Sequence, residues 1–396
     1  MERKRIIYID DGRGIGGAEK NLICFLSDLS KEKIDPLVIV SSRSKFYDLL
    51  CREGIKTRVI ESPVFLSTSF NIGKFAILNP LAIGYDLFLV FMRAVKVRRC
   101  VLESKAEAIQ TNGMFEHICG GIAGRLSLKP CIWFMQDIPR GSFRFIKRAI
   151  INLLAWLLAS KIVAVSGAVK KSFYGVLKKK INVVYVGINI KEYNKNSSQR
   201  NTYLKQKWQC AQAEYIVGIA GRLVFWKGAA DFIKAAAIIS KNLKGAKFII
   251  IGDAIFGKKR YKEYLKLLCK QLGLEDKVIF TGFLDNISEG VDLLDVFVHC
   301  PLYPDPCPIG LMEAGILKKA IVATRTGGIP EIIEDKREGI LVEANNHSDL
   351  AKEVINLLKS PDLRKQIGEK AYSKVVNEFV ISKQTQGFME IYKTLK

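Results

Sequence analysis

Two carboxylates lie near the expected start of a helix in the stretch from His299 to Ala314, which reads HCPLYPDPCPIGLMEA. Pro308 is suited to the first turn of a helix, so the pattern predicts a helix from Ile309 to about Leu317. The N–H groups of a first helical turn have no partner inside the helix and can therefore bind an anion. The stretch thus indicates a site for a phosphorylated ligand.

The two carboxylates have different positions relative to that helix. Asp305 precedes it, and Glu313 lies about one turn inside it. A buried carboxylate on an apolar helix is costly without partners, which indicates a role for Glu313. We expect phosphate to bind the N–H groups of Ile309, Gly310 and Leu311, with one carboxylate facing the loop and the other reaching a ribose diol.

A basic loop, Gly221–Gly228, follows another expected strand and reads GRLVFWKG. Arg222 offers a planar fork for two phosphate oxygens, and Lys227 offers a point charge beside it. The glycines at both ends of the loop suit the approach of a diphosphate. The alternative is that the loop has no ligand and is simply a solvated basic loop. The turn Thr326–Glu331 is a further glycine-rich passage into a helix and a second candidate seat for phosphate or sugar.

The segment Asp11–Glu19 lies between the first expected strand and the first expected helix and reads DGRGIGGAE. Its glycines Gly12, Gly14 and Gly17 satisfy the GxGxxG pattern of dinucleotide-binding proteins. That fingerprint also needs an acidic residue about 20 residues further on, where this chain has two serines followed by Arg43. An arginine suits a ribose phosphate, so NADP binding is weakened but not excluded. Two alternatives to dinucleotide binding remain for this segment. It can be a flexible loop whose backbone N–H groups approach a substrate, or simply a tight turn between strand and helix.

Short runs of valine and isoleucine alternate with amphipathic stretches along almost the whole chain. Such continuous apolar runs are typical of parallel strands covered on both faces, which predicts two doubly wound α/β units. The expected strands are Ile6–Asp10, Pro36–Val40, Ala108–Thr111, Cys131–Met135, Ile162–Val165, Ile181–Val186, Ile216–Ala220, Lys247–Ile251, Lys277–Thr281, Val296–His299, Ala320–Ala323 and Gly339–Val342. The expected helices include Ala18–Leu29, Asp231–Lys241, Lys262–Leu272 and Leu350–Leu358.

The polar, aperiodic segment from Gly187 to Thr202 indicates the joint between the two units. We therefore expect a first domain over residues 1–188 and a second over 189–371. The remaining residues, 372–396, are expected to form a helix beyond the last strand.

Composition limits the classes of protein that the chain can represent. Its 396 residues are enough for about two domains, and 49% of them are hydrophobic, so two packed cores are expected. The 62 basic residues exceed the 39 acidic ones by 23, mainly in the first half. This excess favours an anionic partner, either nucleic acid, a phosphorylated ligand or an acidic membrane, although solubility alone is an alternative.

Cysteine and histidine usage argues against metal and disulfide frameworks. Nine cysteines are scattered without a CxxC pair, and only three histidines are present. The opening residues do not resemble a secretory signal, and the apolar stretch Phe75–Met92 is interrupted by polar residues and proline. We expect a cytoplasmic protein.

Several motifs follow one another along the chain in the order and spacing of one known family. They are Gly16–Glu19, Ser166 after a strand, Arg222 with Lys227, Asp305 with Glu313, and Gly327–Glu331. On these motifs the chain resembles a family-four retaining glycosyltransferase of GT-B fold over nearly its whole length.

This resemblance implies two Rossmann-like domains facing a cleft, with the last helix crossing back to the first domain. It implies that a nucleoside-diphosphate sugar is held mainly by the second domain. The donor-binding positions that it implies are Gly16, Gly17, Arg222, Lys227, Ile309, Gly310, Leu311, Glu313 and Gly327.

The chain departs from the family pattern at two places. The paired-glutamate motif has Asp305 in its first position, one methylene shorter, and we carry over to it the position nearest the donor sugar. Where many relatives have a histidine after the fourth strand, this chain has Gln136 followed by Asp137. Asp137 is a candidate to polarise the acceptor, and the alternative is a residue that caps a loop.

The resemblance also implies a reaction. The sequence has no DxD metal motif, so Arg222, Lys227 and helix N–H groups must neutralise the leaving diphosphate. The implied reaction is hexosyl transfer with retention, by front-face attack, without metal or cofactor, in the synthesis of cell-surface polysaccharide. The acceptor is expected to be a glycan or a lipid-linked glycan.

Basic and apolar residues adjoin one another in the first domain. The stretch Phe143–Ser160 begins basic and becomes almost wholly apolar. Two other apolar stretches are followed by basic residues, one by Arg93, Lys96, Arg98 and Arg99 and the other by Lys178–Lys180. This pattern favours peripheral binding to an anionic membrane, at the inner face, while core helices with solvated ends are the alternative. Two other functions remain as alternatives: an NADP-dependent oxidoreductase, and a basic nucleic-acid-binding protein, against which no nucleic-acid-binding motif is visible.

Overall fold

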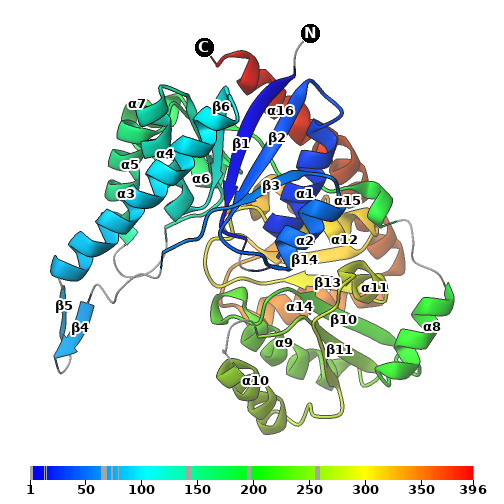
Figure 1. Ribbon diagram of the computed structural model, residues 1–396. Coiled ribbons are helices and arrows are strands. Elements are labelled where there is room, and N and C mark those ends of the chain that lie inside the picture. The colour runs from blue at the N-terminus through cyan, green and yellow to red at the C-terminus, as the bar shows by residue number, and fades with distance from the viewer. Residues whose placement is uncertain are drawn as a thin grey trace. The chain divides into compact units, whose positions relative to one another are not determined.

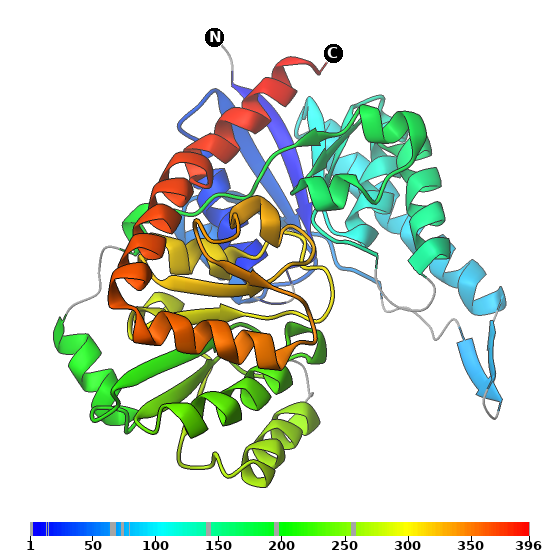
Figure 2. The same cartoon turned by 180° about the vertical axis from the view of Figure 1, so that it is seen from behind.

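The computed structural model describes residues 3–12, 14, 16–63, 69–72, 75–78, 80–139, 144–193, 198–254 and 259–395. Its contacts divide the chain into two compact units (Figures 1 and 2). The first unit comprises Met1–Tyr185 together with Ile381–Lys396, and the second comprises Val186–Val380.

A parallel sheet of seven strands forms the centre of the first unit. In spatial order the strands are β3 (Lys56–Val59), β2 (Ile34–Val40), β1 (Lys4–Asp10), β6 (Ala108–Asn112), β7 (Cys131–Met135), β8 (Lys161–Ala164) and β9 (Asn182–Val183). The central strands β6 and β7 are buried at every position, as strands covered on both faces must be. A separate antiparallel hairpin pairs β4 (Ser69–Ile72) with β5 (Phe75–Leu78).

Helices cover both faces of this sheet. The helices of the unit are α1 (Gly17–Leu29), α2 (Lys45–Arg52), α3 (Pro80–Glu103), α4 (Met114–Ser127), α5 (Arg144–Leu158), α6 (Gly167–Lys170), α7 (Gly175–Lys179) and α16 (Ile381–Lys393). Helix α1 packs on β2 and α16, whereas α4 packs on β1, β6 and β7 and contacts α3 and α5 (Figure 1). Since right-handed crossovers in opposite directions along the sheet place helices on opposite faces, α1 and α4 cover different faces.

The last helix, α16, is fixed to the first unit by buried hydrogen bonds. The Tyr392 hydroxyl donates to Gln110 Oε1 over 2.6 Å and lies 2.9 Å from the Tyr8 hydroxyl. The Asn21 and Gln384 carboxamides exchange two further hydrogen bonds. Residues 381–396 therefore belong with the first sheet although they end the chain.

The second unit contains a six-stranded parallel sheet. In spatial order its strands are β12 (Val278–Gly282), β11 (Ala246–Ile251), β10 (Tyr215–Ala220), β13 (Val296–His299), β14 (Ala320–Thr324) and β15 (Ile340–Val342). Its helices are α8 (Ser198–Lys207), α9 (Ala229–Asn242), α10 (Lys259–Gln271), α11 (Ile287–Asp292), α12 (Ile309–Ile316), α13 (Ile329–Ile332), α14 (His347–Lys359) and α15 (Pro361–Glu378), with single 3₁₀ turns at η1 (Ile190–Glu192) and η2 (Phe225–Lys227). A continuous core of β10, β11, β13, α9 and α14 side chains holds the sheet.

The two Rossmann-like units confirm the predicted fold class. The expected domain boundaries differ from those of the two units. The first unit ends at Tyr185 rather than at residue 188. The expected break at 371/372 falls inside α15, which Pro361 begins and which continues to Glu378. The change of unit comes only after Val380, which pairs with Ile188 in an isolated β-bridge.

Candidate active site

Loops from three neighbouring strands meet at the carboxyl edge of the second sheet. Strands β10, β13 and β14 are adjacent, and each is followed by one of the predicted motifs. Parallel strands all present their carboxyl ends at the same edge, where ligands bind in open α/β sheets. The topology therefore brings together the basic loop, the loop of Asp305 and the turn at Gly327.

A buried carboxylate lies at the centre of this arrangement. Asp305 is only 4% exposed, and its Oδ2 accepts hydrogen bonds from Lys227 Nζ at 2.6 Å and from His299 Nε2 at 3.1 Å. Lys227 also lies over the indole ring of Trp226, with 4.5 Å between Nζ and the ring centroid. The lysine is thus held by both a carboxylate and an aromatic face.

The protonation states of this cluster follow from burial and charge. Burial alone would raise the pKa of Asp305, but Lys227 and the hydrogen bond from His299 outweigh it and hold that pKa below its usual range. Burial lowers the pKa of His299, and Asp305 opposes this shift only in part. At neutral pH the cluster is a carboxylate–ammonium pair that accepts a hydrogen bond from a neutral imidazole.

Two glycines allow the loops to approach this cluster closely. Gly228 has φ +80°, and a Cβ there would overlap the carbonyl of Cys300. Gly327 has φ +62°, and a Cβ there would overlap the backbone of Asp305. The neighbouring Gly328 donates its N–H to the Asp305 carbonyl over 2.8 Å. The predicted glycine turn at Gly327 therefore supports Asp305 directly.

Helix α12 begins at the same edge without a side-chain cap. The Leu311 N–H already donates to the Pro308 carbonyl over 3.1 Å, so the expected anion seat is reduced to Ile309 and Gly310. This difference arises because a tight first turn consumes the third N–H group. Half-buried Glu313 lies one turn further on, as expected.

Sequence reasoning missed one residue of this site. The Tyr193 hydroxyl donates to Glu313 Oε1 over 3.1 Å, and Tyr193 follows η1 in the polar segment that joins the two units. A lone tyrosine in an otherwise polar segment was the available signal, but the pairing joins residues 120 positions apart.

Arg222 supplies a second cation beside the cluster. Its side chain is exposed, and within the part of the chain that the structure describes its guanidinium has no ion pair or hydrogen bond. Gly221, Arg222, Lys227 and His299 line one small cavity at the edge of the sheet. An uncommitted guanidinium, a positioned ammonium and free helix N–H groups together suit a diphosphate.

The predicted residues of the first unit lie at the carboxyl edge of its own sheet. The Gly16 N–H is already committed to Glu19 Oε2 at 2.7 Å, in a capping box that starts α1 at Gly17. Gly16 therefore offers no free N–H group, contrary to a role through its amide. Asp137 is exposed in the loop after β7, and its carboxylate has no hydrogen bond or ion pair among the described residues.

His117 has a structural role in the core. Its Nδ1 lies 2.7 Å from Thr111 Oγ1, and its ring stacks on Trp133 with 4.9 Å between centroids. Burial lowers the pKa of His117 to about 3, so the ring is neutral at physiological pH.

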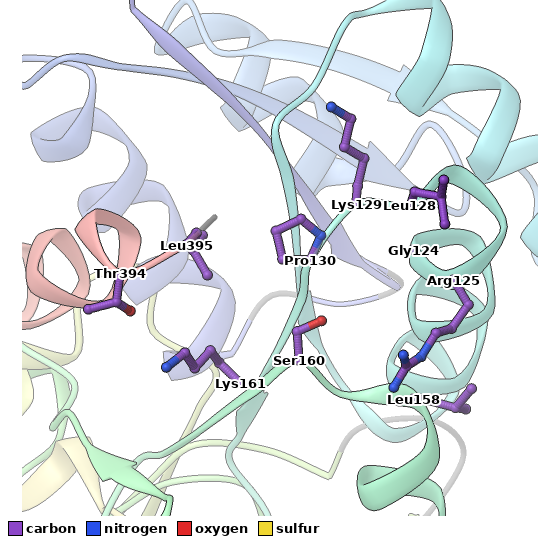
Figure 3. Close-up of a pocket in the computed structure, with 10 residues that line it drawn as sticks. All are labelled: Gly124, Arg125, Leu128, Lys129, Pro130, Leu158, Ser160, Lys161, Thr394 and Leu395. Carbon is purple, nitrogen blue, oxygen red and sulfur yellow. The ribbon is translucent and has the colours of Figure 1, made fainter.

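A roomy cavity of about 310 Å³ lies away from all of these residues. It opens at the amino ends of β7 and β8, and Figure 3 shows Arg125, Lys129 and Lys161 around it. None of the predicted site residues lines this cavity, so its size does not identify the active site.

The model of the family described as "Glycosyl transferases group 1" matches residues 201–374, which lie within the second unit. Among solved structures, HepE of Anabaena in complex with UDP and glucose aligns over 99% of this chain and 100% of its own, with 25% identity and a TM-score of 0.84. The second unit therefore matches the group 1 glycosyltransferase model, and the chain as a whole has the GT-B fold of HepE. The glycosyltransferase WaaG, at 14% identity and a TM-score of 0.68, supports the fold alone.

Curated relatives of the chain agree with this match to the family model. The N-acetyl-alpha-D-glucosaminyl L-malate synthase of Bacillus anthracis is 30% identical over 54% of each chain. A Campylobacter jejuni alpha-1,4-N-acetyl-D-galactosaminyltransferase, named for a GalNAc-containing PP-undecaprenol acceptor, is 23% identical over 99% of each chain. The chain spans 54–61% of the length of the first curated relatives that it matches. Among the described residues no helix is both long and apolar enough to cross a bilayer.

Proposed function

We propose that this protein transfers a hexosyl group from a nucleoside-diphosphate sugar to a glycan or lipid-linked glycan, with retention of anomeric configuration. The observation that carries the proposal is the Lys227–Asp305–His299 cluster beside the uncapped start of α12, with Arg222 in the same cavity. UDP is the nucleotide we propose, since the complexes of HepE contain UDP and UDP-glucose.

Each group in this site has a part in the proposed reaction. Arg222, Lys227 and the first N–H groups of α12 bind the diphosphate, and Glu313, oriented by Tyr193, binds the ribose. Negative charge grows on the diphosphate as the sugar C1–O bond breaks, and donors already in place stabilise it. The protein's own cations perform this role in the proposal, without a metal or an organic cofactor.

Asp305 positions Lys227 in this scheme and lies nearest the donor sugar. The acceptor hydroxyl attacks C1 on the face from which the diphosphate departs, and the leaving phosphate oxygen takes the hydroxyl proton. No histidine base is needed, which agrees with Gln136 standing where many relatives have one. We retain Asp137 as the residue of the first unit proposed to polarise the acceptor.

A lipid-linked acceptor is favoured by an exposed apolar face on α5. Its inner side is fixed by Arg148, which donates to the Ser172 carbonyl over 2.6 Å and stacks on Tyr174, and by Asn152, which accepts from the Tyr174 N–H. The outer side exposes Phe145, Ile146, Ile150, Leu153, Trp156 and Leu157.

Basic residues adjoin this face, since Arg144 and Lys147 are exposed on the same helix. A helix with apolar and cationic groups exposed together suits the interface of an anionic membrane. We propose peripheral binding of the first unit to the cytoplasmic face of a membrane, in polysaccharide synthesis.

The test is turnover of UDP-glucose, UDP-N-acetylglucosamine and UDP-N-acetylgalactosamine with a polyprenyl-diphosphate-linked sugar as acceptor. We expect nucleotide release that depends on the acceptor, persists in EDTA and yields a product with the donor's anomeric configuration. An inverted product would contradict the mechanism. Flotation with anionic and neutral vesicles tests the membrane proposal, which equal retention on both, or on neither, would contradict.

A further inference from the structure

Two polar side chains end neighbouring strands at the carboxyl edge of the first sheet. Asp10 ends β1, Asn112 ends β6, and the two are in register in the parallel ladder. Residues in register on neighbouring strands project to the same face of a sheet. The carboxyl group of Asp10 and the carboxamide of Asn112 are therefore presented together at the edge where α/β sheets bind ligands.

Asn112 has unused hydrogen-bonding capacity. The residue is only 8% exposed, and within the described part of the chain neither its Nδ2 nor its Oδ1 has a hydrogen-bond partner. Buried polar groups in folded proteins are nearly always paired, because leaving one unpaired costs free energy. A carboxamide with both its donor and its acceptor free is what a bound hydroxyl group can satisfy.

A second unsatisfied group lies in the surrounding network. Arg93 of α3 is 2% exposed and donates to Glu116 Oε1 at 3.3 Å and to Ser41 Oγ at 3.1 Å, while its Nε has no partner. The Glu116 carboxylate reaches the residue after Asn112, since a Cβ on Gly113 would lie 2.7 Å from Oε2. This network joins α3, α4 and the end of β2 around the strand ends.

The charges at this edge select among ligands. Burial, together with the carboxylates of Glu19, Glu116 and Asp11, raises the pKa of Asp10 to about 8, against one hydrogen bond from the Gly12 N–H. Burial also raises the pKa of Glu116, although Arg93 opposes this shift. With a pKa of about 8, Asp10 is mostly protonated at neutral pH, and the buried Arg93 guanidinium is already paired with Glu116. The edge therefore suits neutral groups that exchange hydrogen bonds better than it suits phosphate.

We propose that Asn112 and Asp10 form a subsite for the hydroxyl groups of a neutral acceptor sugar. The carboxamide donates to one hydroxyl oxygen and accepts from a neighbouring hydroxyl, and Asp10 accepts from a further one. The subsite takes the sugar end of the acceptor and excludes its diphosphate. This inference rests on the proposed glycosyl transfer and names the acceptor chemistry of that reaction.

The test compares wild type with Asn112→Leu, Asn112→Ala and the matched control Ser27→Ala. Ser27 Oγ is another unpaired buried polar atom among the described residues of the first unit. It lies near the C-terminal end of α1, whereas Asp10 precedes the N-terminal end of that helix. Saturation-transfer NMR is recorded with N-acetylglucosamine, N-acetylgalactosamine, methyl α-glucoside and, as an anionic probe, glucuronic acid. UDP is present in every sample as a reporter of the donor site and of folding.

We expect at least one neutral sugar to receive saturation from wild type and Ser27→Ala, and the signal to fall at least fivefold in both Asn112 variants. Glucuronic acid is expected to give a weaker signal than the neutral sugars. The melting temperature of Asn112→Leu should equal or exceed that of wild type, because an unpaired buried amide is removed.

Neutral-sugar signals that are unchanged in the Asn112 variants, or absent from wild type, would overturn the subsite. So would a melting temperature lowered by more than about 5 °C in Asn112→Leu, since the carboxamide would then be structural. Failure of UDP to bind wild type would instead contradict the proposed donor site. The two failures are therefore distinguished within one set of samples.

Discussion

The carboxyl edges of the two sheets differ in how the surroundings of a carboxyl group shift its pKa. In the second unit, Asp305 has a cation and an imidazole as partners, and its pKa is held low. In the first unit, Asp10 is surrounded by other carboxyl groups, and its pKa is raised to about 8. The second edge is therefore ordered for an anion, whereas the first is ordered for neutral hydroxyl groups.

The largest expected effect comes from removing the cation of the second edge. Lys227→Ala leaves Asp305 buried without its ammonium and removes a donor to the leaving diphosphate. We expect a loss of kcat/KM on the order of 10²–10³ and destabilisation of about 3 kcal/mol. Steady-state kinetics and urea unfolding measure the two effects.

The control for that variant is Lys234→Ala. Lys234 pairs with Asp231 at 3.5 Å on α9, and its side chain is 42% exposed. Such a surface pair contributes little, so activity and stability should stay near wild type. Equal losses in both variants would mean that the Lys227–Asp305 pair has no special role.

A smaller effect is expected from substituting Gly327, where the cost of close packing against Asp305 can be distinguished from the cost of a left-handed backbone conformation. Gly327→Ala and Gly273→Ala both place a side chain at left-handed φ, +62° and +66°, but only Gly327 faces the backbone of Asp305, whereas Gly273 faces open space. We expect a cost of about 1 kcal/mol at Gly273 and about 2–4 kcal/mol at Gly327, with weaker UDP binding only in the latter. Denaturant unfolding and UDP titration check this, and equal costs would contradict the close approach.

The smallest expected effect is a difference in the pH dependence of stability. The folded-state pKa of Asp10 lies above its unfolded value, so the native state binds the extra proton and stability falls as pH rises from about 4 to about 8. Asp305 has the opposite sign, because its depressed pKa supports stability at neutral pH that is lost in acid. Urea unfolding at pH 5, 7 and 9 should show a smaller loss of stability with rising pH for Asp10→Asn than for wild type. Parallel profiles would contradict the burial of Asp10 among carboxylates.

The sequence allowed the fold and the donor-site motifs to be predicted because both depend on local patterns. Continuous apolar runs identified strands such as Cys131–Met135, and Pro308 located the start of α12. The edge strand β3 was missed, since its half-exposed, charged residues lack such a run. The strand expected over Ile181–Val186 is only two residues long, because the apolar run continues beyond its pairing with β8.

Partnerships between distant residues could not be predicted in the same way. Lys227 and Asp305 are 78 positions apart, and their pairing depends on the adjacency of β10 and β13. The same limit applies to Tyr193 and Glu313. Asn112 gave no signal, because a lone asparagine at the end of a strand is ordinary until its missing hydrogen bonds are seen.

The most direct test of the donor site is a calorimetric titration of UDP into wild type, Arg222→Ala and Glu313→Ala, with GDP, ADP and NADP titrated alongside. We expect UDP to bind wild type and to bind each variant at least tenfold more weakly, since each variant loses a charged hydrogen bond to the nucleotide. Binding of NADP alone, with equal affinity in all three proteins, would contradict it and move the nucleotide to the glycine loop of the first unit.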